Sequence, residues 1–225
     1  MLSLARRPLS AAVPAGNLLG IHLFQCPDAV GIVAKLSECI ASRGGNIHSV
    51  DVFVPDDAPV FYARSEFTYN PRLWPRDVLR TDFLRLSDCF GAQKSTVRVP
   101  DIDPKYKIAV LASKQVMSEG FLKAYGKDII NIHHGLLPSF KGGSPSRQAF
   151  NAGVKLIGAT SHFVTPELDA GPIIEQMVER VSHRDTLHSF VVKSENLEKQ
   201  CLAEAIKSYC ELRVLPYEVM KTVVF

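Results

Sequence analysis

The fold is indicated first by the stretch Asp128-Ile129-Ile130-Asn131-Ile132-His133-His134-Gly135, in which a short apolar run ends in polar side chains. Alternate residues of a β-strand share one face, so Asn131 and His133 point one way and His134 points the other. Ligand sites of open α/β sheets lie at the carboxyl ends of the strands. The stretch therefore predicts a buried strand of an α/β sheet with a candidate site at its end.

Strand and helix patterns alternate on both sides of this stretch, over residues 105–225. Strands are predicted over 107–112, 129–133, 156–164 and 173–181, and helices over 115–125, 147–152 and 186–209, before a hairpin over 214–225. Val116, Phe121 and Ala124 are expected to face inward from the first helix, and Asp185 or Thr186 to cap the long one. Because strands alternate with helices, a Rossmann-like parallel sheet is expected, at least for its first strands.

A separate alternating pattern occupies residues 17–100. Strands are predicted over 18–24, 48–54, 61–69 and 93–99, with one helix after the first strand and another after the third. In the first helix, Asp28 is expected as the N-cap, with Val30, Val33, Leu36 and Ile40 on the inner face. The resulting order βαββαβ is the ferredoxin-like plan.

The composition excludes several classes of protein. With 225 residues, 46% hydrophobic and 22% charged, the chain is long enough for one large globular domain or two small ones. No apolar run approaches the ~20 residues that cross a membrane. A net charge of +3 with scattered basic residues does not indicate nucleic-acid binding. The five cysteines include no closely spaced pair of the metal-binding kind, so buried thiols in a reducing compartment are expected.

Residues 1–16 have the composition of an organelle transit segment. Arg6 and Arg7 occur with Ser3 and Ser10, and no acidic residue precedes Asp28. Mitochondrial import is therefore expected, with chloroplast import or a cytoplasmic location as the alternatives. A short tail without a targeting role would have the same appearance.

The candidate site combines Asn131 and His133 with Asp169, which opens the later turn Asp169-Ala170-Gly171-Pro172. Asn131 can donate to a developing oxyanion, and the imidazole of His133 can exchange a proton near neutral pH. Asp169 can hold that imidazole in one tautomer and accept a proton from water. The three side chains suit the hydrolysis of an amide.

His134 is expected to be a packed, hydrogen-bonded core histidine, because it lies on the opposite face of the strand. A zinc site would need His134 together with His133 and Asp169. Adjacent histidines of a strand diverge, and the chain has no His-Glu-x-x-His helix, so no metal site is predicted.

The N-terminal half resembles an ACT domain, a regulatory module that often binds amino acids and pairs through its sheet. The resemblance covers residues 17–100 and rests on the turn at 26–31, Cys26-Pro27-Asp28-Ala29-Val30-Gly31, and the helix exit at 43–47, Arg43-Gly44-Gly45-Asn46-Ile47. It implies an amino-acid ligand and a homo-oligomer. Helix caps alone would also explain these residue types.

The C-terminal half resembles the formyl-transfer fold that acts on 10-formyltetrahydrofolate. The resemblance rests on Asn131-Ile132-His133, on the loop at 137–142, and on His162-Phe163-Val164 followed by Asp169. The ACT-like half in front, the doubled His133-His134 and the strand starting at Gly171 narrow it to the formyltetrahydrofolate deformylase family.

This resemblance implies hydrolysis of 10-formyltetrahydrofolate to tetrahydrofolate and formate, in one-carbon metabolism linked to purine synthesis. The folate is the substrate, and no cofactor is implied. Asn131, His133 and Asp169 match the family's catalytic residues. Ser139, Lys141 and Gly142 are candidates for contacting the substrate, although a flexible loop would explain the same residues. His162 is expected to support the site or to touch the pocket.

The sequence departs from the family between Lys114 and Val116, where members carry about eighty further residues. That segment supplies strands and part of the folate pocket, so the catalytic sheet is expected to be shortened, as in a splice variant or a gene model with a skipped segment. Two alternatives follow: an inactive or regulatory isoform, and formyl transfer to an amine acceptor. The transferases lack the ACT-like module, which disfavours the second.

Overall fold

The structure is a computed structural model that describes residues 13–106, 117–217 and 220–225. The chain divides into two compact units, one up to Lys107 and one from Ile108. This division falls close to the expected domain start at residue 105. The proposed transit segment up to residue 12, the predicted strand over 107–112 and the Lys114–Val116 junction lie outside the described residues.

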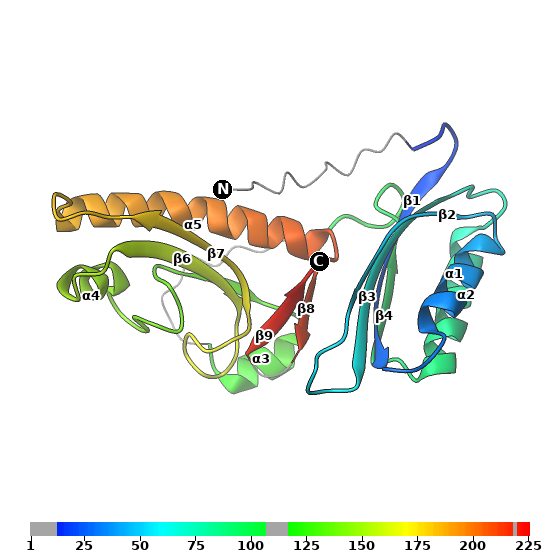
Figure 1. Cartoon of the computed structure of the whole chain (residues 1–225), viewed down its shortest axis with the longest axis horizontal. Helices are drawn as coiled ribbons and strands as arrows, with labels where there is room; N and C mark the ends of the chain where they lie inside the picture. The colour runs from blue at the N-terminus through cyan, green and yellow to red at the C-terminus, as the bar shows by residue number, and fades with distance from the viewer. Residues whose placement is uncertain (1–12, 107–116, 218–219) are drawn as a thin grey trace. The chain divides into compact units, whose positions relative to one another are not determined.

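The first unit has the expected βαββαβ order. Its elements are β1 (Leu18–Pro27), α1 (Ile32–Ala41), β2 (Asn46–Phe53), β3 (Val60–Tyr69), α2 (Arg76–Phe90) and β4 (Lys94–Arg98). The strand order is β2-β3-β1-β4, and each neighbouring pair is antiparallel. Both helices lie on the same side of this sheet (Figure 1). The ferredoxin-like plan read from the sequence is therefore confirmed.

Aromatic residues fill the space between the helices and the sheet of this unit. Phe67 and Phe83 each contact the ring of Trp74, and all three side chains are buried. Leu36 and Ile40 of α1 belong to the same core. Aromatic side chains each bury a large apolar area, so this cluster supplies much of the unit's stability.

The expected start of α1 is wrong. The helix is preceded by Gly31 in a left-handed conformation (φ 92°), with no side-chain cap, so Asp28 is not its N-cap. Val30 lies before the helix and is fully exposed, and Val33 is also exposed. The buried stripe is Ile32, Leu36 and Ile40, because residues four apart share a helix face. Val30 and Val33 are apolar as well, but they do not lie on this buried stripe.

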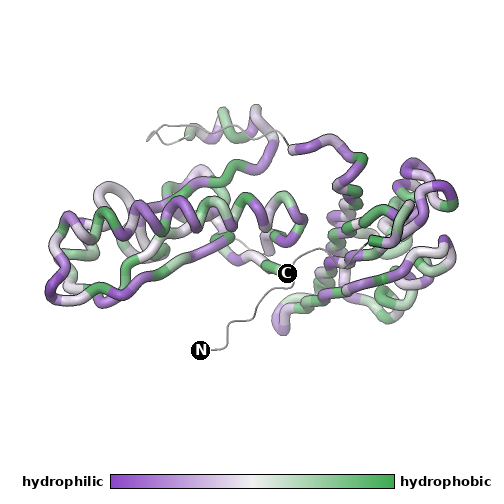
Figure 2. Tube along the Cα trace, turned by 90° about the horizontal axis from the view of Figure 1, so that it is seen from above, coloured by the Kyte–Doolittle hydropathy of each residue, from purple (hydrophilic) through white to green (hydrophobic). Residues whose placement is uncertain are grey.

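The second unit is built on a three-stranded sheet. Its elements are α3 (Glu119–Tyr125), β5 (Ile130–His133), α4 (Pro145–Asn151), β6 (Leu156–Phe163), β7 (Ile173–Arg180), α5 (Leu187–Cys210), β8 (Val214–Tyr217) and β9 (Lys221–Val224). The strand order is β5-β6-β7, and β8 and β9 form the predicted hairpin. Hydrophobic and hydrophilic residues are interleaved along both units (Figure 2).

The described strands pair antiparallel, so the expected parallel arrangement does not extend to them; its first strand, over 107–112, lies outside the described residues. β5 pairs antiparallel with β6, and β6 pairs antiparallel with β7. Only residues 164–172 connect β6 to β7, whereas a parallel crossover needs about a dozen residues or more. The second unit is still α/β, with strands and helices interspersed.

The inward face expected for α3 is also wrong. α3 has no buried residue, and Phe121 is exposed and stacks on Tyr125 one turn later. The long helix agrees better with expectation: the hydroxyl of Thr186 accepts a hydrogen bond from the backbone N–H of Ser189 and caps α5.

One face of the three-stranded sheet packs against α5, which runs beside β6 and β7 (Figure 1). Cys201 of the helix is fully buried, and its sulfur lies 3.4 Å from the hydroxyl of Ser161 and 3.4 Å from the carbonyl oxygen of Glu175. Because side chains alternate between the faces of a strand, the neighbours of Ser161, Thr160 and His162, point to the other face. That second face carries the candidate site.

Candidate functional site

The candidate site is built on two paired strands. Asn131 of β5 lies opposite His162 of β6, and His133 lies opposite Thr160. Residues two apart share a face, so all four side chains lie on the same side of the sheet. His133, His162 and Thr160 are buried, whereas Asn131 is exposed. The site therefore has an exposed amide at one end and buried groups behind it.

The loop between β6 and β7 brings Asp169 to these strands. One carboxylate oxygen, Oδ2, lies 3.3 Å from Nδ1 of His133 and accepts a hydrogen bond of 2.9 Å from the backbone N–H of Gly142. The other, Oδ1, lies 4.0 Å from Nε2 of His162. The side chain of Asp169 is only 7% exposed, so these contacts are made away from bulk water. The structure thus gathers Asn131, His133 and Asp169 at one place, together with His162.

The turn after Asp169 has a tight backbone. Asp169 itself has a left-handed conformation (φ 51°), which aspartate tolerates better than most residues. A Cβ atom on Gly171 would lie 1.7 Å from the carbonyl oxygen of Phe163, the last residue of β6. Beside it, the backbone N–H of Phe163 donates to the carbonyl of Pro172 at 2.9 Å. Only glycine fits this approach of the loop to the strand.

The two ring nitrogens of His162 have distinct roles. Nδ1 lies 2.8 Å from the backbone carbonyl oxygen of Phe163, so it carries the proton in the neutral ring. Nε2 is then an acceptor, and the Nδ2 amide of Asn131 lies 3.5 Å from it, at the outer limit of a hydrogen bond. Burial lowers the pKa of His162, which keeps the ring neutral near pH 7. His162 therefore orients the amide of Asn131 with an N–H toward itself.

Both ring nitrogens of His133 face acceptors. Nδ1 faces the carboxylate of Asp169, and Nε2 lies 3.0 Å from the backbone carbonyl oxygen of Phe140. A neutral imidazole can donate only once, whereas the doubly protonated ring donates to both partners. The ring of His133 is therefore held between the carboxylate of Asp169 and the backbone of the loop that carries Phe140.

The loop residues expected to contact a substrate lie in different environments. Ser139 and Lys141 are exposed, and Nζ of Lys141 lies 3.9 Å from a carboxylate oxygen of Glu167. The backbone N–H of Gly142 is engaged by Asp169. Gly142 thus holds the carboxylate, whereas Ser139 and Lys141 are accessible to a ligand.

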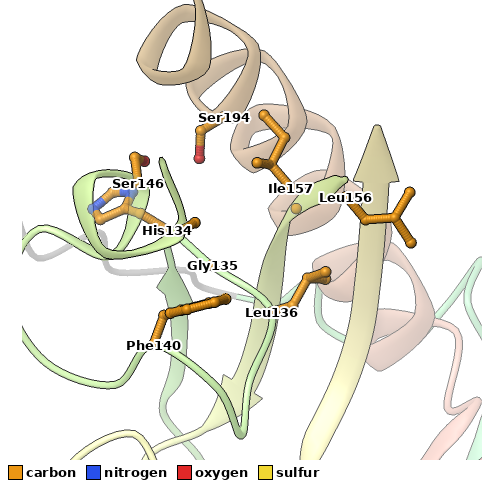
Figure 3. A pocket seen from close by; sticks show the side chains of 10 residues that line it. His134, Gly135, Leu136, Phe140, Ser146, Leu156, Ile157 and Ser194 are labelled. Carbon is orange, nitrogen blue, oxygen red and sulfur yellow. The ribbon is translucent and has the colours of Figure 1, made fainter. Parts of the chain in front are cut away.

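The expectation that His134 is a core histidine is wrong. Its side chain is 52% exposed, and its Nδ1 lies 2.7 Å from the carboxylate of Glu198 on α5. Ser194 donates to the same carboxylate at 3.3 Å. His134 and Ser194 line one small hollow together with Leu136 and Phe140 of the following loop (Figure 3). His134 joins the strand end to α5.

Two residues of the site were not anticipated from the sequence. Thr160 is fully buried, and Gln176 of β7 donates to its hydroxyl at 3.0 Å.

Among the described residues, no three histidine, cysteine, aspartate or glutamate side chains gather as metal ligands. No described helix is long and apolar enough to cross a membrane.

The chain is similar to known proteins over most of its length. Residues 100–206 match the formyl transferase family. Formyltetrahydrofolate deformylase 1, mitochondrial, of Arabidopsis thaliana is 50% identical over 295 aligned positions, which cover 96% of this chain and 91% of the relative. The formyltetrahydrofolate deformylase of Synechocystis sp. is 46% identical over 287 positions, covering 93% of this chain and 99% of the relative.

Solved structures of formyltetrahydrofolate deformylases are also similar to this chain over most of its length. The crystal structure of a formyltetrahydrofolate deformylase from Pseudomonas syringae pv. tomato matches with a TM-score of 0.82 and 28% identity, over 95% of this chain and 96% of that one. A second, from Burkholderia mallei, matches with a TM-score of 0.80 and 27% identity, over 92% of this chain and 99% of that one.

The comparison also measures a gap in this chain. Since 96% of the 225 residues is about 216 residues, about 79 of the 295 positions aligned with the Arabidopsis relative have no residue here. This number is close to the length of the segment expected to be absent between Lys114 and Val116.

Proposed function

Because the chain belongs to the formyltetrahydrofolate deformylase family, we propose that it hydrolyses 10-formyltetrahydrofolate to tetrahydrofolate and formate. The observation that carries this proposal is the buried contact between His133 and Asp169 beside the amide of Asn131. Hydrolysis of an amide needs a proton acceptor for water, a donor to the oxyanion and a proton for the leaving nitrogen. These three side chains supply one group for each need.

The reaction follows from the contacts. Water attacks the formyl carbon, forms the new C–O bond and gives a proton to Asp169. The Nδ2 amide of Asn131 donates to the developing oxyanion, an interaction worth about 3 kcal/mol in a dry site. Nε2 of His133 gives its proton to the leaving nitrogen as the C–N bond breaks, because Nδ1 faces Asp169. Nδ1 of His133 keeps its own proton toward Asp169. The site is restored when Asp169 gives its proton to water and Nε2 of His133 takes one up from water.

His162 and Gly142 complete this assignment without taking part in bond changes. His162 stays neutral and orients the amide of Asn131, and the N–H of Gly142 fixes one carboxylate oxygen of Asp169. Ser139 and Lys141 lie exposed on the neighbouring loop, where they are available to the folate. The anionic tail of a folate would suit the ammonium group of Lys141.

For the N-terminal unit, we propose an ACT domain over residues 17–100 that binds an amino acid and mediates self-association. The βαββαβ order and the antiparallel sheet of this unit support the assignment. Calorimetric titration of the chain with the common amino acids should reveal one that binds, and no heat with any of them would contradict the proposed ligand class.

Mitochondrial import is proposed for residues 1–16, in line with the two Arabidopsis relatives, both named as mitochondrial. Fusion of residues 1–20 to a fluorescent reporter should direct it to mitochondria. A reporter that stays in the cytosol would refute this part of the proposal.

The activity is tested by measuring formate release from 10-formyltetrahydrofolate without any acceptor amine. The chain is compared with a version in which about eighty residues of the Arabidopsis relative are inserted between Lys114 and Val116. Formate release by both is expected. Release by the restored version alone would make the present chain an inactive isoform, and turnover only with an added amine would identify a transferase.

A further inference from the structure

Two residues outside the proposed chemistry, Thr160 and Gln176, make three hydrogen bonds to the loop that follows His133. Thr160 of β6 donates its hydroxyl proton to the carbonyl oxygen of Gly135 at 2.7 Å and accepts from the backbone N–H of Leu137 at 3.0 Å. Thr160 is fully buried. A hydroxyl has one proton and two lone pairs, and the second lone pair accepts from Gln176 at 3.0 Å.

Gln176 extends this contact from the next strand. It is the register partner of Thr160 on β7, and its Nε2 also donates to the carbonyl oxygen of Leu137 at 2.9 Å. Both protons of one amide nitrogen are thus used, one on Thr160 and one on the loop. Together, Thr160 and Gln176 hold both polar backbone groups of Leu137.

The same loop touches the ring of His133. From Gly135 the chain turns back, so that the carbonyl oxygen of Phe140 lies 3.0 Å from Nε2 of His133. Gly142 follows and donates to Asp169. Residues 135–142, called here the His133 loop, therefore carry one contact to each of the two proton-transfer groups.

A packing contact presses the same loop onto β6. A Cβ atom on Gly158 would lie 2.4 Å from Cδ2 of Leu136, so the side chain of Leu136 fills the space that a side chain at position 158 would need. Gly158 and Thr160 point to the same face of β6. Within the described residues, the middle of the His133 loop is thus fixed by hydrogen bonds and by packing, whereas Ser139 and Lys141 stay exposed.

We propose that Thr160 and Gln176 are positioning residues, which set the proton-transfer geometry of His133 and Asp169 through the backbone of the His133 loop. The proposal rests on the proposed hydrolase function. Without these two side chains, the N–H of Leu137 and the carbonyl oxygens of Leu137 and Gly135 lose their hydrogen-bond partners. The loop then shifts, and both the Phe140 carbonyl and the Gly142 N–H move with it.

Two variants of nearly unchanged shape remove the contacts: Thr160→Val and Gln176→Met. Thr160→Ser keeps the hydroxyl and serves as the rescue variant. Val178→Ala is the matched control, because Val178 is exposed on the same strand and face as Gln176. A displacement of about 1 Å can cost about 100-fold in rate, so kcat should fall by about 10- to 100-fold in the first two variants, with a smaller change in KM.

The pH profile and hydrogen exchange separate positioning from simple loss of stability. In Thr160→Val and Gln176→Met, the limb of the kcat/KM profile that reports His133 should move, and the backbone amides of Leu137 and Gly142 should exchange faster. Thr160→Ser and Val178→Ala should keep the parent profile and exchange. Activity that falls only with the folded fraction, with an unchanged profile, would overturn the proposal.

Exchange and the NMR titration of the His133 ring need no turnover. A chain that releases no formate but still shows faster exchange at Leu137 and a moved His133 titration in the variants would contradict the hydrolase and support the positioning role. Unchanged exchange and titration beside full parent activity would contradict the positioning role alone.

Discussion

Replacement of Gly171 by alanine should damage the site with little change in side-chain chemistry. The new Cβ would lie 1.7 Å from the carbonyl oxygen of Phe163, whereas real Cβ atoms stay beyond about 3.0 Å of such a neighbour. The clash is with a backbone atom, so no side-chain rotation relieves it. The turn must therefore move away from β6 by about 1.3 Å or more, the difference between those two distances.

This movement has two consequences with different magnitudes. The hydrogen bond from Phe163 to Pro172, 2.9 Å long, is strained or lost, which costs about 1–3 kcal/mol if its groups stay buried. Asp169, two residues before Gly171, moves with the turn and loses its geometry to His133. A displacement of about 1 Å can cost about 100-fold in rate. Gly171→Ala should therefore release formate about 100-fold more slowly while most of the protein remains folded.

The assay compares formate release and thermal unfolding of Gly171→Ala with those of Gly143→Ala. A Cβ atom on Gly143 would meet no atom within 4 Å, so alanine there should be tolerated. Parent-like rate and melting temperature in Gly171→Ala would refute the close approach of the turn to β6. An equal loss in both variants would show that the rate responds to any added side chain near the site.

Three further predictions concern charge and burial. Asp169→Asn keeps the shape but removes the charge, so formate release should fall by about 10⁴-fold with little change in melting temperature, as for the aspartate of a serine-protease triad; retention of a tenth of the parent rate would contradict its role. Burial lowers the pKa of His22 to about 3, so the folded protein resists protonation of this ring and the unfolded chain does not. The stability that the neutral ring contributes is full above pH 6.5. It is lost as the pH falls from about 6.5 toward 3, by up to about 1.4 kcal/mol per pH unit. Urea midpoints followed by the fluorescence of Trp74, the single tryptophan, should show this loss, and His22→Gln should flatten it; equal slopes in parent and variant would contradict the assignment. Asp82 accepts hydrogen bonds from Trp74 and Arg43, so Asp82→Ala should lower the free energy of unfolding by about 1–2 kcal/mol, measured by the same fluorescence. Asp88→Ala, at an exposed position of the same helix, should leave it unchanged. Equal effects of the two substitutions would show that these contacts contribute nothing specific.

Periodicity predicted the first unit well because its strands and helices each bury one regular face. Leu79, Phe83 and Leu86 of α2 lie at helical spacing and are buried on one face of the helix. The start of α1 was misplaced because Val30 continues the apolar pattern into the turn, where the left-handed Gly31 precedes the helix. The spacing of apolar residues does not reveal the backbone conformation of the residue at which a helix begins.

Periodicity did not predict strand direction in the second unit. Alternation identifies β6 and β7 as strands, but the hydrogen-bonding partner is decided by the path of the connecting loop. The site face was predictable, since Asn131 and His133 are two residues apart on one strand. Asp169, a loop residue far along the chain, has no periodic relation to β5, so its assignment to the site rested on the chemistry of its carboxylate and on the family resemblance.

Residues whose role depends on a neighbour were the hardest to predict. His134 lies on the face opposite His133, as the alternation requires, but its exposure depends on the end of β5 and on Glu198. Thr160 and Gln176 are ordinary polar residues on strands until the His133 loop folds over them. Their signal in the sequence is only that a hydroxyl and an amide lie on the same face as the site.

The most direct test of hydrolysis at this site is the fate of the solvent oxygen. The chain is incubated with 10-formyltetrahydrofolate in water enriched in oxygen-18, with no acceptor amine, and the formate is analysed by mass spectrometry. The attack of water on the formyl carbon predicts one labelled oxygen in each formate released by the parent chain, and almost no formate from Asp169→Asn. Unlabelled formate, or no formate from the parent chain, would contradict the account.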